Sequence, residues 1–474
     1  MKDFDVAIIG GGPAGLFAAH EIVTRSKGKV RVILFEKGRK AIHRKCPMFD
    51  PNRKIRAKKC AKCNPCNVLH GLGGAGALSS GIINLRPDIG GDLDRLVGSW
   101  EEAHKLIQYV DNIFCRFGAP NKVYTIDDDV ASELERLAAK AGAKFIPTPQ
   151  RCIGSERTPL VIENMTKYLE YNGVKILTNT EVLDLEKKSG KISIKTTRGV
   201  FEAKYIVLAP GRSGASWFAK IAVKLGIEII PGPLDIGIRI EVPAYITEPI
   251  TKIVRDPKIV IYTRVYDDKV RTFCTNPHGF VVEERYDDGT IGVNGESYAT
   301  IKSKNTNLAL LVTVKLTDPL EDTIAYGKSI ALLSTKLGGG KPIIQRFGDL
   351  EAGRRSTWNR IERSPIEPTL RDVTPGDISM AYPYRIIANI IEALKKLDII
   401  MPGIASPQTL LYAPEIKYYS VRAVTNKDLE TSLENIFVAG DGVGLSRGIN
   451  VAAATGVIAA NGILKKLGIE TGEL

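Results

Sequence analysis

The chain has 474 residues and a formal net charge of +13, with 44% of its residues hydrophobic and 25% charged. These values exclude a largely disordered, collagen-like or coiled-coil chain. Seven cysteines do not make a disulfide scaffold, two acids among the first five residues argue against a targeting peptide, and no segment is a convincing membrane span. We therefore expect a cytoplasmic protein without a membrane span. Few histidines beside abundant Lys, Glu and Ile also favour a thermophile.

The positive charge is concentrated in one segment. Residues 37–62 hold eleven Lys or Arg and one acid, whereas the rest of the chain carries 55 basic and 52 acidic groups. Such a run is either a solvated surface or a binding site for an anionic partner such as nucleic acid.

The predicted elements begin as in an α/β protein. Strands at 5–9 and 29–35 flank a helix at 14–25, and a Gly-rich loop at 71–81 follows the basic segment. The pattern then continues with helices at 92–117, 130–141 and 159–171, and with short strands at 174–177, 182–186, 191–196 and 200–208.

The pattern changes from about residue 231. Alternating segments predict an antiparallel sheet with strands at 258–265, 270–275, 279–286 and 290–298. Helices at 322–337 and 384–397 accompany these strands, and a strand at 435–439 and a helix at 450–467 return to α/β character. A nucleotide-binding fold interrupted by a β-rich second domain is the simplest account.

A dinucleotide fingerprint follows the first predicted strand. Gly10, Gly12 and Gly15 have the GxGxxG spacing between an apolar strand and an Ala-rich helix. The first glycine permits a tight turn, the second lets the backbone approach a pyrophosphate, and the third allows close helix–strand packing. Glu36 ends the next strand, 21 residues after Gly15. An acid there accepts ribose hydroxyls and disfavours a 2′-phosphate.

The C-terminal region indicates which dinucleotide binds. Residues 436–456 resemble the second FAD signature of the glutathione-reductase-like flavoproteins, and residues 205–212 resemble the strand and turn that close the FAD domain. This resemblance implies that Asp441 hydrogen-bonds the ribityl chain. It also implies that the helix beginning near Asn450 points its N-terminus at the flavin pyrimidine edge, where reduced flavin is negative.

These motifs predict an α/β fold in which a discontinuous, Rossmann-like FAD-binding domain carries an inserted β-rich α+β substrate or cap domain. The expected parts are 1–90, 151–230 and 406–474 for the FAD-binding domain, 37–70 for a basic Cys-rich insertion, 91–150 for a helical segment and 231–405 for the cap. A second complete Rossmann unit is not evident, so a dedicated NAD(P)H domain is not expected. The residues expected to contact FAD are Gly10, Gly12, Pro13, Ala14, Gly15, Glu36, Lys37, Gly74, Ala75, Ser79, Val182, Ala209, Gly211, Gly440, Asp441, Gly448, Ile449 and Asn450.

Four cysteines have a metal-binding pattern. Cys60, Cys63 and Cys66 form a CxxCxxC, and Cys46 lies 14 residues upstream. Four thiolates at this spacing fit an iron–sulfur cluster such as [4Fe–4S] or a structural zinc. Redox-active thiols, a disulfide and unligated cysteines are the alternatives.

Further matches indicate a family. Residues 10–19, 60–66 with 73–77, 209–214, 271–274, 294–298, 348–357 and 413–420 resemble the FAD-utilising dehydrogenases of the glutathione-reductase-like superfamily. The resemblance implies a flavoenzyme but no particular substrate.

We therefore expect an FAD-dependent oxidoreductase. It would transfer hydride or electrons between a donor such as NAD(P)H and a small-molecule acceptor that binds between the two domains. The NAD(P)H would bind transiently, and an iron–sulfur cluster would be one route for the electrons. The candidate catalytic groups are Cys274, His278, Arg354 and Arg355. The alternative is a flavoprotein that binds or modifies RNA through its basic segment. The oligomeric state is not encoded in any recognisable pattern.

Overall fold

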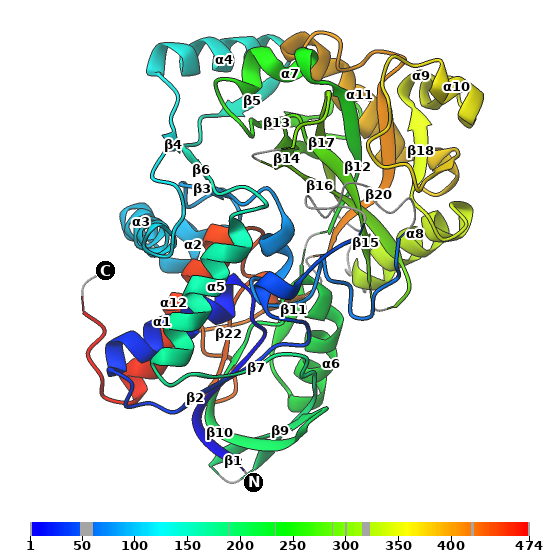
Figure 1. Ribbon diagram of the computed structural model, residues 1–474. Coiled ribbons are helices and arrows are strands. Elements are labelled where there is room, and N and C mark those ends of the chain that lie inside the picture. The colour runs from blue at the N-terminus through cyan, green and yellow to red at the C-terminus, as the bar shows by residue number, and fades with distance from the viewer. Residues whose placement is uncertain are drawn as a thin grey trace.

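The computed structural model describes residues 2–47, 60–188, 190–232, 234–286, 288–298, 301–314, 323–418 and 421–472. Its buried apolar side chains form two large cores and a third, smaller one. Each large core packs against one of two sheets, which lie in the lower and upper halves of Figure 1. The predicted mixed α/β class is confirmed.

The first sheet combines strands from the N-terminal and the C-terminal parts of the chain. Strands β7, β2, β1 and β10 are parallel in that order, and β9 and β8 extend the sheet in antiparallel fashion. The late strand β22 pairs in parallel with the C-terminal half of β10, beyond the part that pairs with β9. The strands are β1 (Lys2–Ile9), β2 (Val32–Phe35), β7 (Lys175–Leu177), β8 (Val182–Lys188), β9 (Lys191–Thr196), β10 (Gly199–Leu208) and β22 (Ile436–Val438).

Helices α1 (Pro13–Ser26) and α12 (Ile449–Lys466) lie side by side against this sheet (Figure 1). A Cβ atom at Gly456 would lie 2.1 Å from the Ala14 carbonyl oxygen, so this contact requires glycine. The other helices near this core are α2 (Leu93–Val97), α3 (Trp100–Arg116), α5 (Thr158–Tyr171) and α6 (Ala215–Leu225).

The long helix predicted for 92–117 is two helices. Gly98 ends α2 in the left-handed conformation, with φ of 80°. Ser99 then caps α3, because its hydroxyl accepts a hydrogen bond from the Glu102 amide at 3.3 Å. The periodic pattern continued across this break, which is why the sequence did not reveal it.

The second sheet has eight strands in the order β19-β18-β20-β12-β17-β14-β13-β5. All neighbours are antiparallel except β18 and β19. The strands are β5 (Ala143–Ile146), β12 (Leu234–Pro243), β13 (Lys258–Tyr262), β14 (Lys269–Asn276), β17 (Asn305–Val314), β18 (Ile343–Arg346), β19 (Thr374–Pro375) and β20 (Leu410–Tyr418). Its helices are α4 (Asp128–Lys140), α7 (Ala244–Thr251), α8 (Thr323–Leu337), α9 (Phe347–Glu351), α10 (Trp358–Glu362) and α11 (Tyr384–Ile400).

Three smaller sheets accompany the two large ones within the described residues. Strand β11 (Ile229–Pro231), where the chain leaves the first sheet, pairs with β21 (Val421–Ala423), where it returns. Strands β15 (Phe280–Arg285) and β16 (Ile291–Glu296) form a hairpin, and β3 (Ile82–Asn84), β6 (Gln150–Cys152) and β4 (Val123–Tyr124) form a three-stranded sheet. The segment expected to be helical over 91–150 also contains β4 and β5, and β5 forms the edge of the second sheet. None of the helices that the structure describes combines the length and hydropathy needed to cross a membrane.

A buried histidine in the first core makes the stability of the protein depend on pH in the acid range. His20 on α1 is 1% exposed and packs against the rings of Phe117 and Tyr168 at 5.8 and 5.4 Å. Its ring nitrogens have no hydrogen-bond partner among the described residues. Burial, and then the charges of Arg116 and Arg25, lower the pKa of His20 to about 4.

The unfolded chain therefore takes up a proton at His20 at higher pH than the folded protein does. The stabilising effect of a neutral His20 is complete above pH 6.5 and is lost as the pH falls toward 4. Between pH 6.5 and 4 the wild type should lose about 3 kcal/mol of unfolding free energy through His20. The His20→Phe variant should not show this loss. Urea unfolding of both proteins at several pH values measures the difference, and parallel curves would contradict the prediction.

Candidate functional site

One cavity lies between the glycine turn of the first sheet and the second sheet, and a smaller cavity adjoins it on the side of the first sheet. Their volumes are about 280 and 140 Å³, together in the size range of cofactor pockets, roughly 300–1,000 Å³. The smaller cavity follows the end of β2, and the larger one faces β13 and β14. The residues that line both are Gly12, Gly74, Ala75, Ala209, Gly211 and Arg212. The two cavities therefore form one elongated site.

The three glycines of the fingerprint have different surroundings. A Cβ atom at Gly10 would lie 2.0 Å from the Ala209 carbonyl oxygen, and one at Gly15 would lie 1.9 Å from the Gly10 carbonyl oxygen. A Cβ atom at Gly12 would meet only the Gly74 Cα atom, at 3.9 Å, within the described residues. Gly10 and Gly15 are therefore required by protein packing, whereas Gly12 borders open space. This is the arrangement that a dinucleotide pyrophosphate requires.

Glu36 organises the smaller cavity. Its carboxylate accepts hydrogen bonds from the backbone amides of Gly11 at 2.8 Å, Gly38 at 2.7 Å and Gly71 at 2.9 Å. Glu36 is only 7% exposed, so these bonds replace water that it has lost. One side chain thus connects the glycine turn to the loop that follows the basic segment.

Asp441 and the start of α12 form the other end of the site. Burial raises the pKa of Asp441, which accepts a hydrogen bond from the Ser446 hydroxyl. Gly448 and Ile449 line the larger cavity at the N-terminus of the helix. Asn450 is buried beneath this surface, where its amide donates to the Asn84 carbonyl oxygen. It therefore holds the loop that carries part of the cavity wall.

The structure brings most of the predicted cofactor residues to these cavities. The residues that line them are Gly10, Gly12, Pro13, Ala14, Glu36, Lys37, Gly74, Ala75, Ser79, Val182, Ala209, Gly211, Gly440, Asp441, Gly448 and Ile449. Gly15 and Asn450 support the lining from behind. The lining agrees with the expected dinucleotide site: Gly12 borders open space, and Glu36 and the start of α12 lie at opposite ends of the joined cavities.

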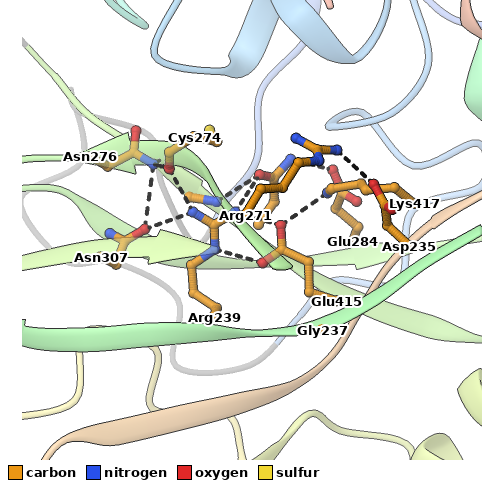
Figure 2. A network of polar contacts seen from close by, with 12 residues as sticks. Asp235, Gly237, Arg239, Arg271, Cys274, Asn276, Glu284, Asn307, Glu415 and Lys417 are labelled. Atoms are coloured by element: carbon orange, nitrogen blue, oxygen red, sulfur yellow. Dashed lines mark hydrogen bonds and ion pairs between the residues drawn. The ribbon is translucent and has the colours of Figure 1, made fainter. Parts of the chain in front are cut away.

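Of the predicted catalytic residues, Cys274 lines the larger cavity. It has a left-handed backbone with φ of 49°, at an irregularity in the pairing of β14 with β17. Arg239 Nη1 and Asn276 Nδ2 donate to its carbonyl oxygen at 2.9 and 2.8 Å (Figure 2). These hydrogen bonds support a conformation that costs of order 1–3 kcal/mol in a residue with a side chain.

The other three candidates do not line either cavity. His278 Nε2 lies 3.3 Å from Glu248 Oε1, and its other ring nitrogen lies 3.0 Å from the Ser303 carbonyl oxygen. Arg354 donates to Asp349 at 2.9 Å, and Arg355 is exposed. The sequence pattern could not show this, because the distance from the cavity depends on the path of the loops.

The four candidate metal ligands are half-buried and form no disulfide with one another. Cys60 Sγ accepts a hydrogen bond from Arg285 Nε at 3.4 Å, and burial raises the pKa of Cys66. Among the described residues, no group of three or more His, Cys, Asp or Glu is arranged to hold a metal ion. Residues 48–59, which carry much of the basic segment, lie outside the described residues.

The basic side chains of the larger cavity were not among the residues predicted from the sequence. Arg212 and Arg447 directly adjoin predicted residues, and Lys258, Lys269, Arg271 and Lys417 come from β13, β14 and β20. The one pattern that could have indicated them is the alternation of residues 269, 271 and 273 along β14, because alternate residues of a strand share one face.

A buried ionic network lies behind the cavity wall. Arg239, which is fully buried, donates to both carboxylate oxygens of Glu415, at 2.8 and 2.6 Å. Lys417 Nζ contacts the same carboxylate at 3.0 Å. Arg271 reaches Asp235 at 2.6 Å on the other side of this group (Figure 2). The network joins β12, β14 and β20 and fixes the cavity-facing side chains of the sheet.

Comparison with known proteins agrees with this geometry. A family model described as "FAD-dependent protein, C-terminal domain-like" matches residues 233–418. An uncharacterised protein of Clostridium beijerinckii is 25% identical over 489 residues, which cover 97% of this chain and 80% of that protein. The family match over the second sheet and the glycine-lined site both agree with the predicted use of FAD.

Solved structures similar to this chain include an oxidase and a dehydrogenase. The glycine oxidase of Geobacillus kaustophilus has 14% identity and a TM-score of 0.40, over 98% of this chain and 95% of that one. The L-proline dehydrogenase of P. horikoshii has 13% identity and a TM-score of 0.45, over 99% and 95%.

Proposed function

We propose that the protein transfers hydride or electrons between a donor such as NAD(P)H and a small-molecule acceptor bound in the larger cavity. The observation that carries the proposal is the glycine-lined cavity, in which Gly12 borders open space while Gly10 and Gly15 are packed. Bound FAD would supply the hydride-accepting group. The chain would position the acceptor against it between the two sheets and exclude water.

Different segments of the chain would form the two domains. Residues 1–90, 151–230 and the part of 406–474 that follows β20 would act as a discontinuous, glutathione-reductase-like FAD-binding domain. Residues 231–405 would act as the inserted cap together with β20, which lies in the second sheet. The pairing of β22 with β10 and of β21 with β11 supports this division, because it returns the C-terminal residues to the first sheet. The second sheet then contributes Cys274 and several basic groups from the opposite side.

An iron–sulfur cluster or zinc ion at Cys46, Cys60, Cys63 and Cys66 stays a separate hypothesis. The spacing of the cysteines supports it, whereas their thiols do not converge in the part of the chain that the structure describes. RNA binding through the basic segment is likewise a hypothesis that rests on charge alone.

Anaerobic spectroscopy of the purified protein tests the proposed function. We expect equimolar FAD whose absorbance bleaches on addition of NADH or another two-electron donor and returns with an acceptor. Iron and zinc analysis of the same sample decides the cysteine hypothesis. A protein that neither retains FAD nor binds it when it is added would refute the proposal.

A further inference from the structure

Three side chains of β14 face the larger cavity together. Lys269, Arg271 and Phe273 are spaced two residues apart, so they project from the same face of the strand. All three line the cavity, opposite the glycine turn of the first sheet. The second sheet therefore offers a row of two cations and an aromatic ring to a bound molecule.

Most of the other charges around this cavity are neutralised within the protein. Arg271 pairs with Asp235 at 2.6 Å, Lys417 pairs with Glu415 at 3.0 Å, and Lys258 pairs with Asp256. The acidic residues Asp88 and Asp256 of the lining are themselves paired with basic groups. Arg212 and Arg447 also line the cavity, and their charges act on the buried carboxyl of Asp441. Of the lysines in the lining, one has no such partner among the described residues.

Lys269 is that lysine. Its ammonium group has no hydrogen-bond or ion-pair partner among the residues that the structure describes, although the side chain is half-buried. Burial and then the charge of Arg271 lower the pKa of Lys269; Arg447 acts in the same direction, and Asp235 and Asp92 oppose it. An ammonium that has lost part of its water and has no direct ion-pair partner is unfavourable, and a bound anion would offset that cost.

The neighbouring aromatic ring suggests the rest of the ligand. The ring centroid of Phe273 lies 5.0 Å from Arg271 Cζ, 5.7 Å from Lys258 Nζ and 5.8 Å from Lys417 Nζ. Apolar side chains complete the wall around it: Ile82, Ile89, Ile146, Ile259, Val260 and Ile449. The cavity thus combines a cationic end with an apolar surface.

We propose that the larger cavity binds a small organic acid, with its carboxylate on Lys269 beside Arg271 and its apolar part against Phe273. This inference rests on the proposed function, because it assigns the chemical class of the substrate in the same site. Carboxylate recognition by paired basic groups explains why Lys269 has no protein counter-ion.

Binding of benzoate to the FAD-loaded protein tests this assignment. Calorimetry and the change in flavin absorbance give its affinity, with the uncharged isostere benzamide and inorganic phosphate as the other probes. We expect benzoate to bind and benzamide and phosphate to bind much more weakly. Lys269→Met should weaken benzoate binding by about tenfold or more, since hydrogen bonds to charged groups are worth that much. Lys269→Arg should retain binding.

Lys144→Met is the matched control. Lys144 lies on β5 of the same sheet, is exposed and does not line the cavity, so its replacement should leave benzoate affinity unchanged. FAD content, measured from the spectrum of each variant, reports on the proposed function separately. Full FAD content with equal benzoate affinity in the wild type and Lys269→Met would overturn the inference alone. Binding of benzamide as tight as benzoate, or of phosphate instead of benzoate, would also overturn it.

Discussion

Gly12→Ala is expected to weaken FAD binding by about tenfold or more while the protein stays folded. Gly12 has φ of −75°, which alanine adopts without strain. The added methyl group would meet only the Gly74 Cα atom, at 3.9 Å, among the described residues. It would instead enter the space where the two cavities join, at the place where the backbone must approach a pyrophosphate.

Gly15→Ala provides the contrast. Its Cβ atom would lie 1.9 Å from the Gly10 carbonyl oxygen, so the turn itself must move. We expect this variant to lose stability and FAD together, whereas Gly12→Ala loses FAD affinity alone. Denaturation of the apoproteins and fluorescence titration with FAD separate the two effects. Unchanged FAD affinity in Gly12→Ala would place the pyrophosphate elsewhere.

Arg239→Met is expected to destabilise the protein by about 3–5 kcal/mol, because it leaves a buried carboxylate without its main partner. The side chains of Arg239 and Glu415 are both 0% exposed, and their two hydrogen bonds span 176 positions of sequence. Arg239 also donates to the Cys274 carbonyl oxygen and to the amide oxygens of Asn294 and Asn307. Its loss therefore leaves several buried acceptors short of a donor.

Two further variants test whether the loss of stability in Arg239→Met comes from the buried network. In Arg239→Met/Glu415→Gln we expect no return of stability, since Lys417 then loses the carboxylate it pairs with at 3.0 Å and stays buried as an unpaired ammonium. Arg136 pairs with Glu133 on the surface, where both side chains are 60% exposed, and Arg136→Met should leave stability unchanged. Urea unfolding measures all three. Equal stability of Arg239→Met and the wild type would show that the network contributes nothing to the fold.

The cofactor-binding part of the site was predictable because its requirements are local. A glycine turn between a strand and a helix places Gly10, Gly12 and Gly15 by their spacing alone, and an acid at the end of the next strand follows at a set distance. The C-terminal motif carries Gly440, Asp441 and Gly448 in the same way. In each case one short motif contributes several residues to the cavity wall, so the local sequence is sufficient to predict them.

The catalytic and metal predictions had no such local basis. Cys60, Cys63 and Cys66 are close in sequence, yet Arg285 from a distant hairpin contacts the Cys60 thiol. His278 and Arg354 have suitable chemistry, but their loops turn them toward Glu248 and Asp349. Spacing does not specify the direction of a side chain on an irregular loop, and these residues illustrate why.

The sequence was thus sufficient to establish the α/β class, the FAD fingerprint and the position of the excess charge along the chain. Tertiary structure alone decided that Lys269 and Arg271 face Gly12 across a cavity, and that Arg239 neutralises Glu415 behind it. The physical reason is that backbone conformation depends on neighbouring residues, whereas the pairing of charges depends on which strands meet. Strands β12, β14 and β20 meet only when segments far apart in the chain are folded into one sheet.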